Sequence, residues 1–267
     1  MRIYHYTNIE TLALILKNKT IRFNRLDRVD DLEEGQSECS GIKVGQYIFV
    51  SCWTEDPEES IPLWRMYTDK GVGVRIGLEK DMFKTYTYND GDVINGVAME
   101  GKVKTHLSPD MLAMSNLFIA PCFNDGVFYR SVRYVPNVAE AMKNAVTRNP
   151  NGSFNFELSK LGAYKNLRWS FQNESRFVLN IYPKPSRISV GEKIFATWLC
   201  SVLNEGIPNT INYYDLVLDN VALDSIDITL CPNMSEGNKV LVESLCKTYL
   251  NNVMPKQSTL TNIVNLK

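Results

Sequence analysis

The chain has 267 residues, of which 44% are hydrophobic and 22% are charged, a composition typical of a folded protein with a substantial core. The formal net charge of −1 excludes a strongly basic field over the whole molecule of the kind that attracts nucleic acid, although it does not exclude local basic patches.

The cysteines and the absence of long apolar stretches narrow the class of protein further. Six cysteines, at positions 39, 52, 122, 200, 231 and 246, form no C-x-x-C pair, so a zinc site with local hairpin ligands has no support. The first residues lack the apolar core of a signal peptide, and no stretch has the length of a membrane helix. We therefore expect a cytoplasmic protein with reduced thiols and no membrane partner.

The first predicted elements are a strand through Ile3 and Tyr4 and a helix that follows at once. Apolar residues recur at helical spacing from Ile9 to Leu16. Thr7 and Glu10 fit a capping box, which would start this helix. His5, one of only two histidines in the chain, is thereby placed at a strand end beside a helix start, where it is either a hydrogen-bonded structural group or a functional one.

An acidic loop follows a short predicted strand over residues 20–24. It runs from Arg25 to Gly35 and contains Asp30, Asp31, Glu33 and Glu34. A solvated or helix-capping loop is the ordinary interpretation of such a run, and Asp31 and Glu34 would then anchor it over a site. Oxygen ligands for Mg²⁺ or Ca²⁺ are the alternative, although the spacing is not that of a calcium loop.

Two strands and an intervening helix are predicted next. Residues 47–53 form a continuous apolar run, typical of a strand buried on both faces, and residues 71–78 alternate as a strand does. Between them, Ile61, Trp64 and Tyr67 fall on one side of a helix over residues 61–67.

The middle of the chain predicts strands over residues 93–99 and 129–135. Ser108, Pro109 and Asp110 indicate a helix start, and residues 137–147 and 154–167 also have helical spacing. After them, residues 169–181 pass from an aromatic loop into an alternating strand. Because strand side chains repeat every second residue, Gln172, Glu174 and Arg176 are expected on one face.

The remaining sequence predicts a helix over residues 196–205, a strand over 225–230 and a helix over 235–251. No linker, repeat or low-complexity tract appears, so the chain is expected to be a single mixed α and β domain without regular βαβ alternation. The glycine-rich motifs G-x-G-x-x-G and G-x-x-x-x-G-K-[ST], which cradle phosphates, do not occur.

Three short motifs together resemble the ADP-ribosyltransferases. They are His5-Tyr6-Thr7 on the first strand, Ser51-Cys52-Trp53 on a buried strand, and Gln172-x-Glu174 on a late one. The first is similar to the opening motif of bacterial toxins that ADP-ribosylate DNA and of the poly-ADP-ribose polymerases, and the last looks like the Q-x-E form of the toxin glutamate motif. The resemblance implies an α+β fold, a single domain over residues 1–267 with a mixed, largely antiparallel split sheet flanked by helices.

Most of the chain is also similar to a bacterial domain-of-unknown-function family with H-Y-T, N-D-P-x-E, C-[FW]-[ST], W-x-x-Y and W-x-x-x-x-E-x-R motifs. The matching segments begin at His5, Asp30, Cys52, Trp64 and Trp169. The second motif departs from its pattern, because Asp30 replaces asparagine and Leu32 replaces proline.

The resemblance implies that NAD is cleaved at its nicotinamide glycosidic bond and that ADP-ribose passes to a protein or nucleic acid, in toxin or phage-defence roles. Such a reaction passes through an oxocarbenium-like sugar, which a nearby carboxylate stabilises. The implied catalytic residues are Glu174 beside the ribose and Gln172 facing the acceptor. The implied NAD-binding residues are His5 at a ribose hydroxyl, Thr7 or the nearby backbone at the nicotinamide amide, Trp53 or Tyr67 stacked on a ring, Ser51 and Arg176.

Each role has an alternative. Glu174 and Arg176 are also the pattern of a same-face ion pair, and Trp53, Trp64 and Tyr67 that of ordinary core aromatics. Instead of an enzyme, the same fold would serve as a non-catalytic module that senses a nucleotide or binds a protein, and the acidic loop makes a metal-dependent nuclease a weaker third option.

Overall fold

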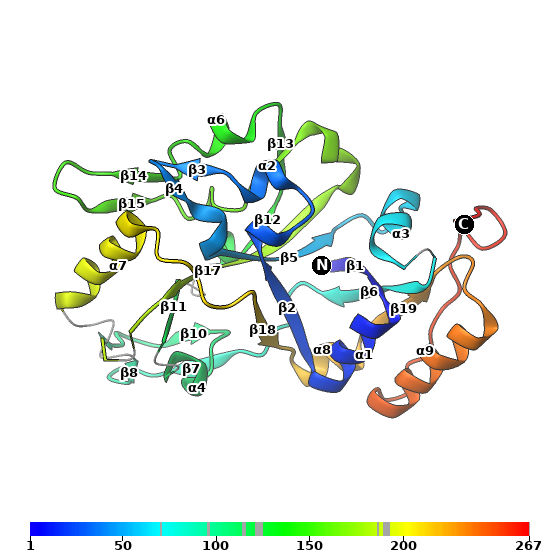
Figure 1. Cartoon of the computed structure of the whole chain (residues 1–267). Helices are drawn as coiled ribbons and strands as arrows, with labels where there is room; N and C mark the ends of the chain where they lie inside the picture. Colours follow the sequence, from blue (N-terminus) through cyan, green and yellow to red (C-terminus); the bar gives the residue numbers. More distant parts are fainter. Residues whose placement is uncertain are drawn as a thin grey trace.

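The centre of the structure is an antiparallel sheet built around two long buried strands (Figure 1). The computed structural model describes all residues except 70, 95–96, 114–115, 121–124, 186, 189–192 and 267. The strands lie in the order β11-β17-β5-β1-β6-β19, with β12 beside β17, β2 beside β5 and β18 beside β2. Their bounds are β1 Arg2–Asn8, β2 Thr20–Arg25, β5 Ile48–Thr54, β6 Gly73–Glu79, β11 Leu117–Ala120, β12 Tyr129–Ser131, β17 Glu174–Pro183, β18 Tyr213–Val217 and β19 Asp227–Leu230.

The sheet divides at β5. One edge of β5 pairs with β17 along its whole length, from Ile48 to Thr54. The other edge is shared, since β1 pairs at Thr54 and β2 pairs at Val50 and Phe49. Residues 51–53 therefore have no ladder partner on this edge among the described strands, and β1 and β2 diverge on either side of them.

Both faces of β5 and β17 are buried, as the apolar run of β5 predicts, although β17 also carries buried polar residues, among them Glu174 and Arg176. Alternate residues enter two different cores: Phe49 and Phe177 lie in the first, and Val50 and Val178 lie in the second. Cys52, Thr54, Glu174 and Arg176 share the even-numbered face, because the register pairs Arg176 with Cys52 and Glu174 with Thr54. The polar end of this face is the place where the candidate site forms.

Helices cover the sheet and its edges (Figure 1). The longer ones are α1 Ile9–Asn18, α3 Ile61–Tyr67, α7 Lys193–Glu205 and α9 Glu236–Tyr249. The shorter ones are α2 Leu32–Gly35, α4 Pro109–Ala113, α5 Asp125–Phe128, α6 Val138–Met142 and α8 Asn220–Asp224, with 3₁₀ turns η1 Leu26–Arg28, η2 Val44–Tyr47 and η3 Leu167–Gln172. Among the described residues, none of the helices combines the length and the apolar character that spanning a bilayer requires.

Small two-stranded sheets lie outside the central sheet. In Figure 1 some of them are drawn at the top and others at the lower left. Their pairs are β3 Glu38–Cys39 with β4 Ile42–Lys43, β7 Tyr86–Tyr88 with β10 Val103–Thr105, β8 Val93–Ile94 with β9 Val97–Ala98, β13 Arg133–Val135 with β16 Tyr164–Asn166, and β14 Val146–Arg148 with β15 Phe154–Phe156. Only the β13–β16 pair is parallel among these described ladders. The α+β class and the largely antiparallel sheet are thus as expected.

The predicted helix over residues 154–167 is wrong. Phe154 and Phe156 belong to β15, and residues 164–166 form β16. Gly162 between them has a left-handed φ of 69°, and a Cβ there would lie 3.2 Å from the Ile48 side chain, so the backbone turns tightly against β5. The apparent helical spacing arises from apolar residues that belong to two strands and a turn.

Three other predicted elements are shorter or divided. The helix expected over residues 137–147 is confined to α6, and the strand expected over 129–135 divides into β12, which pairs with β17, and β13, which pairs with β16. The strand expected over 93–99 is a hairpin of β8 and β9, and residues 95–96 of that prediction lie outside the described residues.

The cap of α1 also differs from the expectation. Asn8, not Thr7, is the N-cap residue, and its side-chain oxygen accepts from Thr11 N at 2.7 Å. Thr7 is instead a buried residue of β1, paired with Val74. The strand continues one residue further than the capping box requires.

Replacing Asn8 by Ala is expected to lower the free energy of unfolding by about 1 kcal/mol, because one early helix amide loses its acceptor. Chemical denaturation of Asn8→Ala, Asn8→Ser and Thr7→Val measures this. Asn8→Ser retains a cap and Thr7→Val retains the buried volume, so both should lose less. A larger loss of stability for Thr7→Val than for Asn8→Ala would indicate that Thr7, and not Asn8, caps the helix.

Candidate functional site

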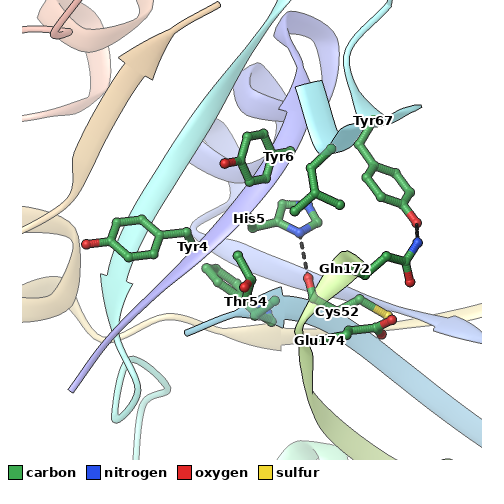
Figure 2. Close-up of a pocket in the computed structure, with 10 residues that line it drawn as sticks. Tyr4, His5, Tyr6, Cys52, Thr54, Tyr67, Gln172 and Glu174 are labelled. Atoms are coloured by element: carbon green, nitrogen blue, oxygen red, sulfur yellow. Dashed lines mark hydrogen bonds between the residues drawn. The ribbon is translucent and has the colours of Figure 1, made fainter. Parts of the chain in front are cut away.

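A pocket opens at the point where β1 leaves β5 (Figure 2). Its walls come from β1, β5, the end of η3, the start of β17 and α3, and its empty volume, counted together with space open to solvent, is about 360 Å³. The lining residues are Tyr4, His5, Tyr6, Cys52, Trp53, Thr54, Leu63, Tyr67, Gln172 and Glu174. Sequence segments that are far apart, the first strand and the Gln172-x-Glu174 motif, therefore meet at one cavity.

His5 occupies the gap between the diverging strands. Its Nδ1 lies 2.8 Å from the Cys52 carbonyl oxygen, a backbone acceptor on the unpaired edge of β5. A carbonyl only accepts, so Nδ1 carries the proton in the neutral ring and Nε2 is left as an acceptor. Burial lowers the pKa of His5 and so favours this neutral form. The hydrogen bond with the Cys52 carbonyl acts in the opposite direction but is the smaller effect.

Glu174 is a buried, ionised carboxylate. Arg176 Nε donates to Oε1 and Lys165 Nζ lies 2.9 Å from Oε2. Burial alone would raise the pKa of Glu174, but Arg176 and Lys165 outweigh it and lower the pKa to about 2. The carboxylate therefore keeps its negative charge at neutral pH while forming part of the pocket wall.

This carboxylate belongs to a cluster of four charges of alternating sign, which we call the buried quartet: Glu34, Lys165, Glu174 and Arg176. Arg176 donates through both Nη atoms to Glu34, with Nη2 to Oε2 at 2.9 Å, and is fully buried. Burial disfavours its charge, but Glu174 and Glu34 prevail and hold the pKa of Arg176 well above its ordinary value. Two positive and two negative groups leave the quartet neutral, which limits the cost of burying them.

A chain of hydrogen bonds extends from the quartet across the pocket. Lys165 Nζ donates to Gln172 Oε1 at 2.6 Å, and Gln172 Nε2 donates to the Tyr67 hydroxyl at 2.7 Å. The Tyr67 hydroxyl in turn donates to Asp30 Oδ2 at 3.3 Å. These contacts fix the orientation of the Gln172 amide and connect α3 to the acidic loop.

Gln172 reaches the site differently from the prediction. It ends η3 rather than lying on β17, and Asn173, with a left-handed φ of 43°, separates it from the strand. The shared-face argument is right for Glu174 and Arg176, which contact each other, and wrong for Gln172. Lys165, which binds both Gln172 and Glu174, brings the two together instead.

The Ser51-Cys52-Trp53 motif contributes walls more than free polar groups. Trp53 is 3% exposed, and the centre of its ring lies 5.2 Å from that of the His5 ring. Its Nε1 donates to Ser51 Oγ at 2.9 Å. Burial raises the pKa of the Cys52 thiol, and the negative charge of Glu174 acts in the same direction, so Cys52 is not a thiolate. Figure 2 shows the sulfur beside the Glu174 carboxylate. Thr7 lines neither this pocket nor the hollow next to it.

Two of the predicted aromatic residues differ in burial. Trp64 is completely buried and belongs to the first core, whereas Tyr67 is 38% exposed and lines the pocket. Glu59 fixes α3 from the other side, since its carboxylate accepts from Trp64 Nε1 at 3.0 Å and from Thr259 N at 2.7 Å. The helix that carries Tyr67 is therefore held in place by the contacts of Glu59.

A second, larger hollow of about 1800 Å³, part of it open to solvent, adjoins the pocket. Its walls come from α1, β2, β18, the acidic loop, the middle of β5, which contributes Ser51, and β17, which contributes Arg176. His5, Cys52 and Tyr67 line both cavities, so the two are neighbours.

The acidic loop is held by contacts with protein groups. Asp31 accepts from the backbone amides of Glu33 and Glu34, Glu34 pairs with Arg176, and Glu33 accepts from Asn166 Nδ2. The anchoring role expected for Asp31 and Glu34 is what these contacts show. Across the described part of the chain, no three His, Cys, Asp or Glu side chains are placed to hold a metal ion.

Sequence reasoning missed Lys165, which is the hub between Gln172 and Glu174. Lys165 falls within the helix predicted over residues 154–167, which does not form, so nothing in the sequence indicates that its side chain is buried. The only available signal is the short distance along the chain to Gln172 and Glu174.

Comparison with protein-family models, curated proteins and solved structures finds no match for this chain.

Replacing Glu34 by Gln is expected to lower the free energy of unfolding by about 3 to 5 kcal/mol, because one buried positive charge loses its partner. Urea denaturation of Glu34→Gln measures the loss. Glu33→Gln is the matched control, because the Glu33 side chain is exposed. This substitution should change the free energy of unfolding by less than about 0.5 kcal/mol. Equal effects of the two substitutions would contradict the buried quartet.

The lowered pKa of His5 predicts a loss of stability in mild acid. Below about pH 6.5, the ordinary pKa, the unfolded chain binds a proton that the folded His5 resists, so the free energy of unfolding falls until the folded pKa is passed. The slope from this residue is at most about 1.4 kcal/mol per pH unit. Denaturation of wild type and His5→Gln across pH 5 to 8 should show a smaller slope in the variant; identical slopes would contradict the burial of His5.

Proposed function

We propose that this chain is an NAD-dependent ADP-ribosyltransferase-like enzyme, which cleaves the nicotinamide glycosidic bond and transfers ADP-ribose to a protein or nucleic acid. The observation that supports the proposal is that His5 and Glu174, 169 positions apart by their numbers, line one pocket together with Gln172 and Tyr67. The toxin and phage-defence roles that the resemblance implies belong to the same proposal.

Glu174 has the properties that the chemistry requires. When NAD loses nicotinamide, the bonding electron pair leaves with the ring nitrogen and positive charge develops on the ribose. An ionised carboxylate already fixed by Lys165 and Arg176 stabilises that charge without reorganising. The acceptor then supplies an electron pair to the same sugar carbon and gives up its proton.

His5 and Tyr67 would position the substrate. The free Nε2 of His5 is an acceptor for a ribose hydroxyl, since Nδ1 is committed to the Cys52 carbonyl. The exposed part of the Tyr67 ring offers a flat surface for the nicotinamide, and burial raises the pKa of its hydroxyl, which stays protonated. Gln172, next to Glu174 in the wall, would face the acceptor.

A second candidate function follows from the same contacts. Both oxygens of Glu174 already bind cations of the protein, which is also the arrangement of a purely structural carboxylate. A module that binds a nucleotide without cleaving it would have this geometry. Nicotinamide release separates the two functions, because only the enzyme produces it.

Glu174→Gln is expected to reduce nicotinamide release from NAD by about 100-fold or more, since the charge facing the sugar is lost. Chromatography of nicotinamide, and label transfer from NAD to a cell lysate, measure the two half-reactions. Gln172→Ala should reduce the transfer of label more than the release of nicotinamide. Equal nicotinamide release by wild type and Glu174→Gln would remove the enzymatic proposal.

Two further variants keep this test interpretable. Because Glu174→Gln unbalances the buried quartet, the double variant Lys165→Met/Glu174→Gln removes one charge of each sign and preserves neutrality. It should fold and remain inactive. Glu236→Gln, an exposed carboxylate on α9, is the matched control and should retain full activity. A rise in the melting temperature with NAD but no nicotinamide from wild type would favour the binding module.

A further inference from the structure

An ordered pair of flat side chains, Arg22 on β2 and Tyr213 on β18, lies in the second hollow. The Arg22 guanidinium lies over the Tyr213 ring, 3.5 Å from Cζ to the ring centre. Asp215, directly opposite Arg22 in the ladder, binds it with both oxygens, Nε to Oδ1 at 2.9 Å and Nη2 to Oδ2 at 3.0 Å. The bidentate contact fixes the plane of the guanidinium.

This pair is exposed although it is ordered. The Arg22 side chain is 41% exposed, Tyr213 is 47% exposed, and both line the hollow. Flat groups that are already fixed lose little conformational freedom when a ligand arrives, and aromatic and guanidinium planes are the surfaces on which nucleobases stack. The side chains therefore form a platform for a planar heterocycle.

Polar groups of the same hollow complement a nucleotide. The amides of Asn18 and Asn24 line it, and amide side chains can pair with the edge of adenine. Arg28 also lines it and is exposed, and no carboxylate pairs with it in the part of the chain that the structure describes. A guanidinium without a counter-charge is suited to a phosphate group.

We propose that the second hollow binds the adenosine diphosphate half of a dinucleotide, with adenine on the Arg22–Tyr213 platform and the diphosphate at Arg28. The nicotinamide riboside half then lies in the first pocket, past the shared residues His5, Cys52 and Tyr67. This inference rests on the proposed use of NAD, and it assigns the residues that distinguish an adenine dinucleotide from nicotinamide alone.

Calorimetric titration with ADP, ADP-ribose and nicotinamide mononucleotide tests the platform. Tyr213→Ala should weaken binding of ADP and ADP-ribose by about tenfold and leave that of nicotinamide mononucleotide unchanged. Tyr213→Phe keeps the ring and should bind ADP like wild type. Tyr249→Ala removes a similarly exposed tyrosine from α9, which lines neither cavity, and should have no effect.

The phosphate contact has its own comparison. Arg28→Gln should weaken the binding of ADP by several-fold and that of adenosine hardly at all. The affinity for ADP should also depend less steeply on salt concentration.

Unchanged ADP binding in Tyr213→Ala, or absence of ADP binding to wild type, would overturn this inference. ADP has no nicotinamide bond, so its binding is independent of turnover. Tyr213-dependent ADP binding without nicotinamide release would leave the inference standing and remove the enzymatic proposal; nicotinamide release with Tyr213-independent ADP binding would do the reverse.

Discussion

The buried quartet is the interaction on which the candidate site depends. Arg176 lies at its centre and joins the acidic loop, through Glu34, to the strand that carries Glu174. Lys165 extends the network to Gln172 and so to Tyr67 and the loop again. Because each charge is compensated by a neighbour of the opposite sign, the site keeps ionised groups in a place where an isolated charge would be expelled or neutralised. The same contacts that make burial tolerable also fix the geometry of the pocket wall.

The divided edge of β5 provides the other half of the site. A continuous ladder would have used the Cys52 carbonyl for pairing with another strand, and His5 would have had no backbone acceptor there. The divergence of β1 and β2 leaves that carbonyl to the imidazole, and the two neighbouring cavities lie at the same place. A polar group of the main chain is thus satisfied by a side chain, as buried polar groups generally are, and the tautomer of the histidine follows from it.

The sequence predicted those parts of the fold that depend on local periodicity. The buried strands β5 and β17, the helix α3 and the contact between Glu174 and Arg176 follow from apolar runs and from two-residue or helical spacing. It failed where the partner lies elsewhere in the chain: Phe154 and Phe156 resemble a helix face until β14 is known to pair with them. Lys165 could not be found because its burial depends on a turn at Gly162. The second hollow was also missed, since its platform joins β2 to β18, a strand that the periodicity did not indicate.

A neutral set of buried charges also restricts how such a sequence can diverge. Loss of one member strands a charge in the interior, whereas joint replacement of an acid and a base by apolar residues of similar size is often neutral or even stabilising. Change at Glu34, Lys165, Glu174 and Arg176 is therefore coupled in pairs. A descendant could discard the carboxylate of the Gln172-x-Glu174 motif together with Lys165 and keep its architecture, so inheritance of the fold and inheritance of the chemistry are separable here.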